Sequence, residues 1–278
     1  MGLRINTNVQ SVAAQRSLRL TKNKLNDNLR KLSSGMRITR ASDDAAGLAI
    51  SEKLKTHIRG LGQAKRNAND GISLIQTAEG ALSEVSNIII RLRELAIQSA
   101  TDTLGADERR FIDIEFQQLK DEVNRIASST EFNGIKLLDG TGGLLEFQVG
   151  VHNDPTLDRI RYDGFQADSS LQSLGLLNER VNTKETSQAS LKILDSALVR
   201  VNGVRANLGA TQNRLSSVVN TLGISSENLS TANSRVRDVD VASETAAMTK
   251  NNILFQAGAS VLSQANQLPN VALKLLNG

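Results

Sequence analysis

The sequence has little of what most globular proteins use to build a core or a reactive site. Its 278 residues include no Cys, no Trp, one Tyr, six Phe, two Pro and two His. Without Cys there can be no disulfide and no thiolate metal ligand. Since aromatics are scarce, Leu, Ile, Val and Ala must supply most of the buried surface. Only Pro155 and Pro269 can break a helix by geometry, so we expect long helices.

Long hydrophobic runs are also missing. The opening residues, 1–8, contain no apolar stretch of the kind found in a signal peptide. No later window approaches the roughly 18 consecutive apolar residues of a membrane helix. We therefore expect no membrane association, and a secreted protein with this start would need an export route without a cleaved signal.

Positive charge is concentrated near the start of the chain. Residues 1–66 hold 14 Lys and Arg against 4 Asp and Glu, whereas residues 251–278 carry only Lys274. A basic arm can indicate nucleic-acid binding. Here the basic residues surround apolar heptads and no aromatic side chains alternate with them to stack on bases. We therefore interpret them as a solvated helix face and expect no nucleic-acid partner.

The strongest signal is a set of apolar residues spaced seven apart, the pattern of coiled-coil helices. A helix expected over about 44–100 carries the stripe Leu61, Ala68, Ile75, Leu82, Ile89 and Ala96. A helix of about 50 residues from Lys184 carries Leu194, Val201, Leu208, Leu215, Leu222, Leu229 and Val236. A shorter helix between them carries Ile112, Phe116, Leu119, Val123 and Ile126. We expect the two long helices to pair antiparallel, with the short one packed beside them, and we interpret Gly71 and Gly80 as points of close packing.

Similar stripes occupy both ends of the chain. A helix expected over 9–38 carries Leu18, Leu25, Leu29, Leu32 and Met36. The last segment carries Leu254, Gly258, Val261, Ala265, Leu268, Ala272 and Leu275. An isolated pair of such helices is marginal in water, so we expect the two ends to be disordered or loosely formed in the monomer. We interpret these residues as a polymerisation interface that orders when subunits pack head to tail into an open helical filament.

Between the helices the periodicity changes. Turn signals at Asp139-Gly140 and Gly142-Gly143 flank short apolar runs, so a small β-hairpin region is expected over about 135–177. Ser42 or Asp43 is the expected N-cap of the second helix. The predicted fold class is mainly α: long antiparallel coiled-coil helices, with N- and C-terminal segments paired, and a small β-hairpin region.

Several segments near the two ends of the chain form distinctive motifs. At the N-terminal end these are Ile5–Asn8, Leu32–Ile38, Asp43–Gly47 and Arg66–Ser73. At the C-terminal end they are Ser234–Asp238 and Gln256–Gln267. These segments resemble those of bacterial flagellin, and the matches run along nearly the whole chain in the right order.

The resemblance implies a structural subunit that polymerises into the helical flagellar filament, outside the cell. It implies an inner core domain from 1–42 and 239–278 and a rod domain from 43–180 and 181–238. Larger flagellins carry outer variable domains, for which the roughly 50 residues between Gly134 and Lys184 leave no room. Implied partners are other copies of the chain, the flagellar type III export apparatus, a cytoplasmic flagellin chaperone, and the filament cap and hook-filament junction proteins. The alternative within the resemblance is another axial component, such as a hook-filament junction protein.

The stretch 91–97 is similar to the part of flagellin that host flagellin-sensing Toll-like receptors bind. The resemblance assigns contacts to Arg91, Leu95 and Glu115, although Ile90 stands where many receptor-visible flagellins have a polar residue. No catalytic, cofactor or metal site is expected. The two histidines, His57 and His152, are far apart in the sequence and lack neighbouring ligands at suitable spacing. An enzyme and a soluble coiled-coil adhesin are therefore the less favoured classes.

Overall fold

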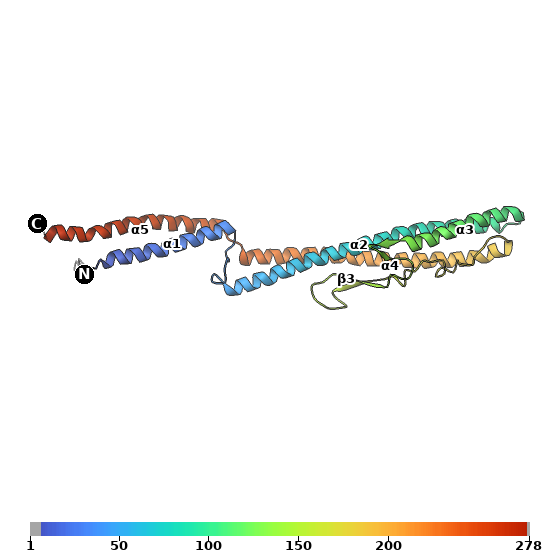
Figure 1. The fold of residues 1–278 in the computed structure, drawn as a ribbon, viewed down its shortest axis with the longest axis horizontal. Helices are drawn as coiled ribbons and strands as arrows, with labels where there is room; N and C mark the ends of the chain where they lie inside the picture. The colour runs from blue at the N-terminus through green and yellow to red at the C-terminus, as the bar shows by residue number, and fades with distance from the viewer. Residues whose placement is uncertain (1–6, 277–278) are drawn as a thin grey trace. The chain divides into compact units, whose positions relative to one another are not determined.

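The structure is a computed structural model. It describes the backbone of residues 7–276 and the side chains of residues 7–267. In this part of the chain the helices are α1 (Val9–Ser34), α2 (Ala45–Ser99), α3 (Ala106–Ser129), α4 (Lys184–Arg237) and α5 (Val241–Leu276). The strands are β1 (Glu131–Phe132), β2 (Ile135–Lys136), β3 (Leu144–Gln148) and β4 (Arg159–Asp163). The mainly α fold class is confirmed (Figure 1). None of these helices is both long and apolar enough to cross a membrane.

The chain forms two compact units, and the larger, residues 57–227, contains the main hydrophobic core. The predicted stripes form this core. Of the predicted α2 stripe, the residues that are fully buried are Ala68, Ile75, Leu82, Ile89 and Ala96. Of the predicted α4 stripe, the buried residues are Leu194, Val201, Leu208, Leu215 and Leu222. The Arg93 guanidinium on α2 pairs with Asp195 on α4 at 2.7 Å, as antiparallel pairing of the two helices requires.

The two glycines in the middle of α2, Gly71 and Gly80, have different surroundings. A Cβ atom on Gly71 would lie 3.1 Å from the ring of Phe147 on β3, so Gly71 marks a close approach, as predicted. Nothing lies within 4 Å of the position that a Cβ atom on Gly80 would take. The prediction of close packing at Gly80 is therefore wrong, because a glycine in a heptad pattern does not by itself say which face of the helix it occupies.

The strands form two small antiparallel hairpins. Asn133 and Gly134 join β1 to β2 with positive φ angles of 49° and 79°, as in a tight turn of the type that suits strand twist. β3 pairs with β4 from Leu144 opposite Asp163 to Gln148 opposite Arg159. The β region thus begins at Glu131 rather than 135, since Asn133-Gly134 closes a hairpin of its own. Its last strand ends at Asp163, well before 177.

Residues 164–183 form no strand, and buried polar side chains of α3 bind the backbone near the end of this segment. The Lys120 ammonium is 3% exposed and donates to the carbonyl oxygens of Leu177 and Glu179 at 3.1 and 2.9 Å. Asp113 Oδ1 accepts a hydrogen bond from the Val181 N–H at 2.9 Å. Burial lowers the pKa of Lys120. These contacts hold the segment against α3, where the sequence pattern predicted hairpin structure up to 177.

The smaller unit comprises residues 1–56 and 228–278, and in it α1 and α5 lie side by side and antiparallel (Figure 1). Both terminal segments are helical along their described lengths, where a disordered or loosely formed state was expected. The units divide the chain at 56/57 and 227/228, inside α2 and α4, whereas the expected divisions fell at 42/43, 180/181 and 238/239. The difference has a local cause. Contacts among the two connectors, the start of α2 and the end of α4 join these ends to the terminal helices.

Candidate assembly interface of the terminal helices

The inner face between α1 and α5 contains part of the predicted stripe. Leu18, Leu25, Leu32 and Met36 on α1 and the following turn are half-buried. On α5, Ala265 is buried, and Gly258 comes so close to Leu18 that a Cβ atom would lie 3.2 Å from its methyl carbon. Here the small residue lets the two helices approach closely, as predicted. Leu268, Ala272 and Leu275 have side chains outside the described part.

The outer face contains the rest of the stripe. Leu254 and Val261 are 47% and 54% exposed, and Leu29 is 49% exposed. The heptad spacing had placed them beside the inner residues. Instead, the half-buried companions of Gly258 and Ala265 are Met248, Phe255 and Leu262. The stripe therefore divides into an inner and an outer set, because a seven-residue spacing fixes the period of a helix face but not which of two neighbouring rows meets the partner helix.

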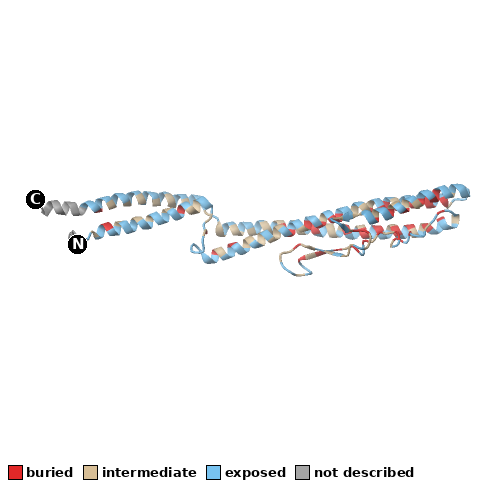
Figure 2. Cartoon of the chain, viewed as in Figure 1, coloured by how far each residue is buried: buried red, intermediate tan, exposed pale blue. Residues whose placement is uncertain are grey.

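Other apolar side chains are also exposed on the terminal helices, which are mostly pale blue in Figure 2. They are Val9, Val12 and Leu20 on α1, and Val241 and Ile253 on α5, all more than half exposed. Exposed apolar surface of this density on two neighbouring helices is typical of a protein interaction surface.

A polar cluster within the inner face fixes how α1 and α5 align. Asn28 on α1 is 8% exposed. Its side-chain N–H donates to Glu244 Oε1, and its Oδ1 accepts from the Asn251 amide at 2.7 Å. Further along, Asn8 donates to the Ala265 carbonyl at 2.7 Å. Buried amides in an apolar seam specify register, because any slip leaves them unpaired. No role for Asn28 was predicted from the sequence, although it follows Leu25 by three residues, which is the spacing of a second seam position.

The connectors between the helix pairs are bonded to each other. Met36 and Asp238 form an antiparallel bridge, in which the Arg37 N–H donates to the Arg237 carbonyl at 2.7 Å. The Arg237 guanidinium also reaches Glu52 Oε1 on α2 at 2.6 Å. Three chain segments, the two connectors and the start of α2, are thereby joined in one place.

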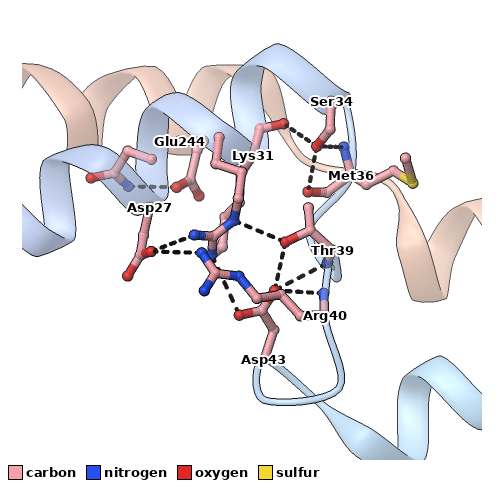
Figure 3. A network of polar contacts seen from close by, with 10 residues as sticks. Asp27, Lys31, Ser34, Met36, Thr39, Arg40, Asp43 and Glu244 are labelled. Carbon is pink, nitrogen blue, oxygen red and sulfur yellow. Dashed lines mark hydrogen bonds and ion pairs between the residues drawn. The ribbon is translucent and has the colours of Figure 1, made fainter.

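The first connector is closed by Asp43 (Figure 3). One carboxylate oxygen of Asp43 accepts from the backbone N–H groups of Thr39 and Arg40 and from the Thr39 hydroxyl. The hydrogen bonds from the Thr39 hydroxyl and backbone N–H, with the positive charges of Arg30 and Lys31, lower the pKa of Asp43. The N-cap of α2 is Asp44, whose carboxylate accepts from the Gly47 N–H at 2.9 Å. The expected cap, Ser42 or Asp43, was therefore misplaced, because Asp43 is used by the turn that precedes the helix.

The residues of the receptor-like stretch lie in different environments. Arg91 donates to Glu115 on α3 at 2.9 Å and to Glu94 at 3.0 Å, all on the surface. The hydrogen bond to Glu115, then that to Glu94, raises the pKa of Arg91. Leu95 is 1% exposed and belongs to the core. The structure thus brings Arg91 and Glu115 together as a surface pair and leaves Leu95 out of reach of a partner.

Comparison with known protein families identifies the chain from both ends. Residues 5–142 match the family model of the bacterial flagellin N-terminal helical region, and residues 191–276 match that of the bacterial flagellin C-terminal helical region. The chain belongs to the bacterial flagellin family. As a flagellin it is a structural protein, the subunit that polymerises into the extracellular filament of the bacterial flagellum.

Individual flagellins agree with this assignment. The chain is 46% identical to a flagellin of Halalkalibacterium halodurans over 272 residues, covering 98% of this chain and 99% of that one. It is 43% identical to a flagellin of Bacillus subtilis, covering 99% and 100%. The crystal structure of Bacillus cereus flagellin is 35% identical and superposes with a TM-score of 0.51, covering 56% of this chain and 88% of that chain. The alternative of a hook-filament junction protein is not favoured.

Proposed function

We propose that the outer apolar side chains of α1 and α5 form the contacts between flagellin subunits in the filament. The observation that carries the proposal is that Leu254 and Val261 keep strict heptad spacing yet leave about half of each side chain exposed. Because about half of each side chain is already covered, burial of the rest by a neighbouring subunit would contribute roughly 1 kcal/mol for each. In the sequence, Leu268 and Leu275 continue the same seven-residue spacing.

The inner residues would act in assembly by a different route. Leu18, Leu25, Leu32, Met36 and Gly258 would hold α1 against α5 and so present the outer face. In α1 only Ser11 and Asn28 are buried, and among the described side chains of α5 Ala265 is the one buried apolar residue, so this part of the pair is held by little apolar surface. This sparse burial supports a pair that gains much of its stability when subunits surround it.

The test is the double substitution Leu254→Ser with Val261→Ser. We expect the monomer to keep the helicity and melting curve of its larger unit and to lose polymerisation, measured by sedimentation and electron microscopy. Gln256→Ser is the matched control, because this side chain is also exposed on α5 and ends in a polar amide. Filaments from the double variant with the yield and length of the wild type would overturn the proposed surface.

We also propose that α1 with α5 corresponds to the inner core domain and the remaining helices with the hairpins to the rod domain, without outer variable domains. The short span between β4 and α4 supports the last point. The filament would then be thinner than those of flagellins with outer domains, which electron microscopy can measure.

For export, we propose passage through the flagellar type III apparatus without a cleaved signal peptide. A cytoplasmic chaperone would hold the C-terminal segment, and the cap and hook-filament junction proteins would act at the filament ends. Family membership and the absence of Cys support this route, since no disulfide has to be broken for threading. A chain truncated before α5 should fail to bind the flagellin chaperone of its own organism, whereas the full chain should bind it.

Recognition by a host flagellin-sensing Toll-like receptor is proposed through Arg91 and Glu115. Their surface ion pair supports the proposal, since Arg is enriched among residues that dominate interface energies. Arg91→Ala should lower receptor activation while leaving the melting temperature almost unchanged. Equal activation by wild type and variant would remove Arg91 from the interface.

A further inference from the structure

The two histidines of the chain, 95 positions apart in the sequence, meet in the larger unit. The ring of His57 on α2 and the ring of His152 in the loop after β3 have centroids 5.8 Å apart and an interplanar angle of 67°. His57 is half-buried and His152 is exposed, so solvent and ions reach the pair. A zinc–imidazole nitrogen bond is about 2.0–2.1 Å long, which places ligating ring centroids roughly 4.5–6 Å apart. The observed separation falls in this range.

The backbone around His152 is held in place by hydrogen bonds on both sides. The Gln148 side chain donates to the His152 carbonyl at 2.7 Å and to the Gly150 carbonyl at 3.0 Å. The Asp158 carbonyl accepts from the Val149 N–H at 2.7 Å and closes the loop. A site whose ligands sit on a fixed backbone needs little reorganisation when it binds an ion.

Gly60 brings this loop close to α2. It lies three residues after His57, on the neighbouring part of the same helix face. A Cβ atom on Gly60 would lie only 2.9 Å from the Cγ1 atom of Val151, the residue before His152. Since valine is stiff at χ1, a larger residue at position 60 would push the loop and its histidine away.

We propose that His57 and His152 form a two-histidine site for a divalent transition-metal ion, of which Zn²⁺ and Ni²⁺ are the probes. Imidazole is a good ligand for both ions. In the described part of the chain no group of three or more His, Asp or Glu side chains could hold a metal, so water fills the remaining positions. The ion would join the β3–β4 loop to α2 and stabilise the larger unit by an amount that rises with the logarithm of the free ion concentration once this exceeds the dissociation constant. This proposal does not depend on the assembly surface, because none of its residues lies in α1 or α5.

The amino-acid composition leaves few competing metal ligands in the experiment. With two histidines and no cysteine, untagged protein has no other imidazole or thiol ligand. In proton NMR of the imidazole region, both histidines should respond together and saturate at one Zn²⁺ per chain, and Zn²⁺ should raise the melting temperature. His57→Gln and His152→Gln should each weaken binding at least about tenfold, since even losing an outer-shell partner weakens metal affinity 10–100-fold. Melting without metal verifies that each variant is folded.

A pair of glycine variants tests the geometry without touching a ligand. Gly60→Ala should weaken Zn²⁺ binding, whereas Gly62→Ala, where nothing lies within 4 Å of the new Cβ atom, should leave it unchanged. Equal affinity in these two variants would remove Gly60 from the proposal. If the wild type binds Zn²⁺ and Ni²⁺ no more tightly than the two histidine variants, the rings form only an edge-to-face aromatic contact and the proposed site does not exist.

Discussion

At the scale of single residues, Tyr162 offers the most direct test of the packing. It is 3% exposed, and its hydroxyl donates to the Leu137 carbonyl at 2.7 Å. Burial, with a smaller effect from the charge of Asp163, raises the pKa of Tyr162 to about 12. The neutral phenol is therefore favoured by folding. This stabilisation is complete below the ordinary value near 10 and is lost as the pH rises from about 10 to about 12.

The prediction can be measured because the chain has one Tyr and no Trp. The ultraviolet absorbance of tyrosinate should appear near pH 12 in the folded protein and near pH 10 in denaturant. Unfolding by denaturant should also become easier over the same interval, by on the order of 2–3 kcal/mol. Titration near 10 while circular dichroism remains native would contradict the burial of Tyr162.

At the scale of helices, Asn28 tests how α1 and α5 are aligned. Asn28→Ala would leave Glu244 and Asn251 without this partner in the inner face, at a cost of about 1–3 kcal/mol. We expect faster hydrogen exchange in α1 and lower total helicity, with the melting of the larger unit unchanged. Asn26→Ala is the control, because Asn26 is exposed on the same helix. Equal exchange rates in the two variants would show that the polar cluster does not hold the pair.

A second test on a helix compares the two glycines of α2. Gly80→Ala should stabilise the protein by up to about 1 kcal/mol, because alanine is the better helix former and its Cβ atom meets open space. Gly71→Ala should increase the stability of the protein by less than this, or lower it, since the new Cβ atom would press on Phe147. Thermal melts of the two variants decide the order. A higher melting temperature for Gly71→Ala than for Gly80→Ala would contradict the packing of β3 on α2.

How far the sequence predicted these features depends on the kind of pattern. The rod helices were predicted because residues such as Leu194 and Leu215 repeat every seven positions and pack within one chain. The exposure of Leu254 was not predicted, since periodicity alone does not show which of two neighbouring rows of a helix contacts the partner helix. The roles of Lys120 and Asn28 also escaped prediction, as isolated polar residues leave no periodic signal. The meeting of His57 and His152 depends on long-range packing, which residue spacing does not reveal.

At the scale of the whole molecule, the two units should respond differently to truncation. The larger unit has a continuous core, whereas the described side chains of α1 and α5 bury little apolar surface between them. Deleting residues 243–278 should therefore abolish polymerisation and leave a cooperatively melting, helical protein by circular dichroism. Loss of all helix on this truncation would contradict the independence of the rod.

The central claim, that this flagellin polymerises through its terminal helices, is tested most directly by electron microscopy of the purified full chain. Precipitant salt or filament seeds would be added, with the chain lacking residues 243–278 alongside. We predict long tubular filaments from the full chain and none from the truncated one. A full chain that stays small under every such condition, or a truncated chain that forms the same filaments, would contradict the account.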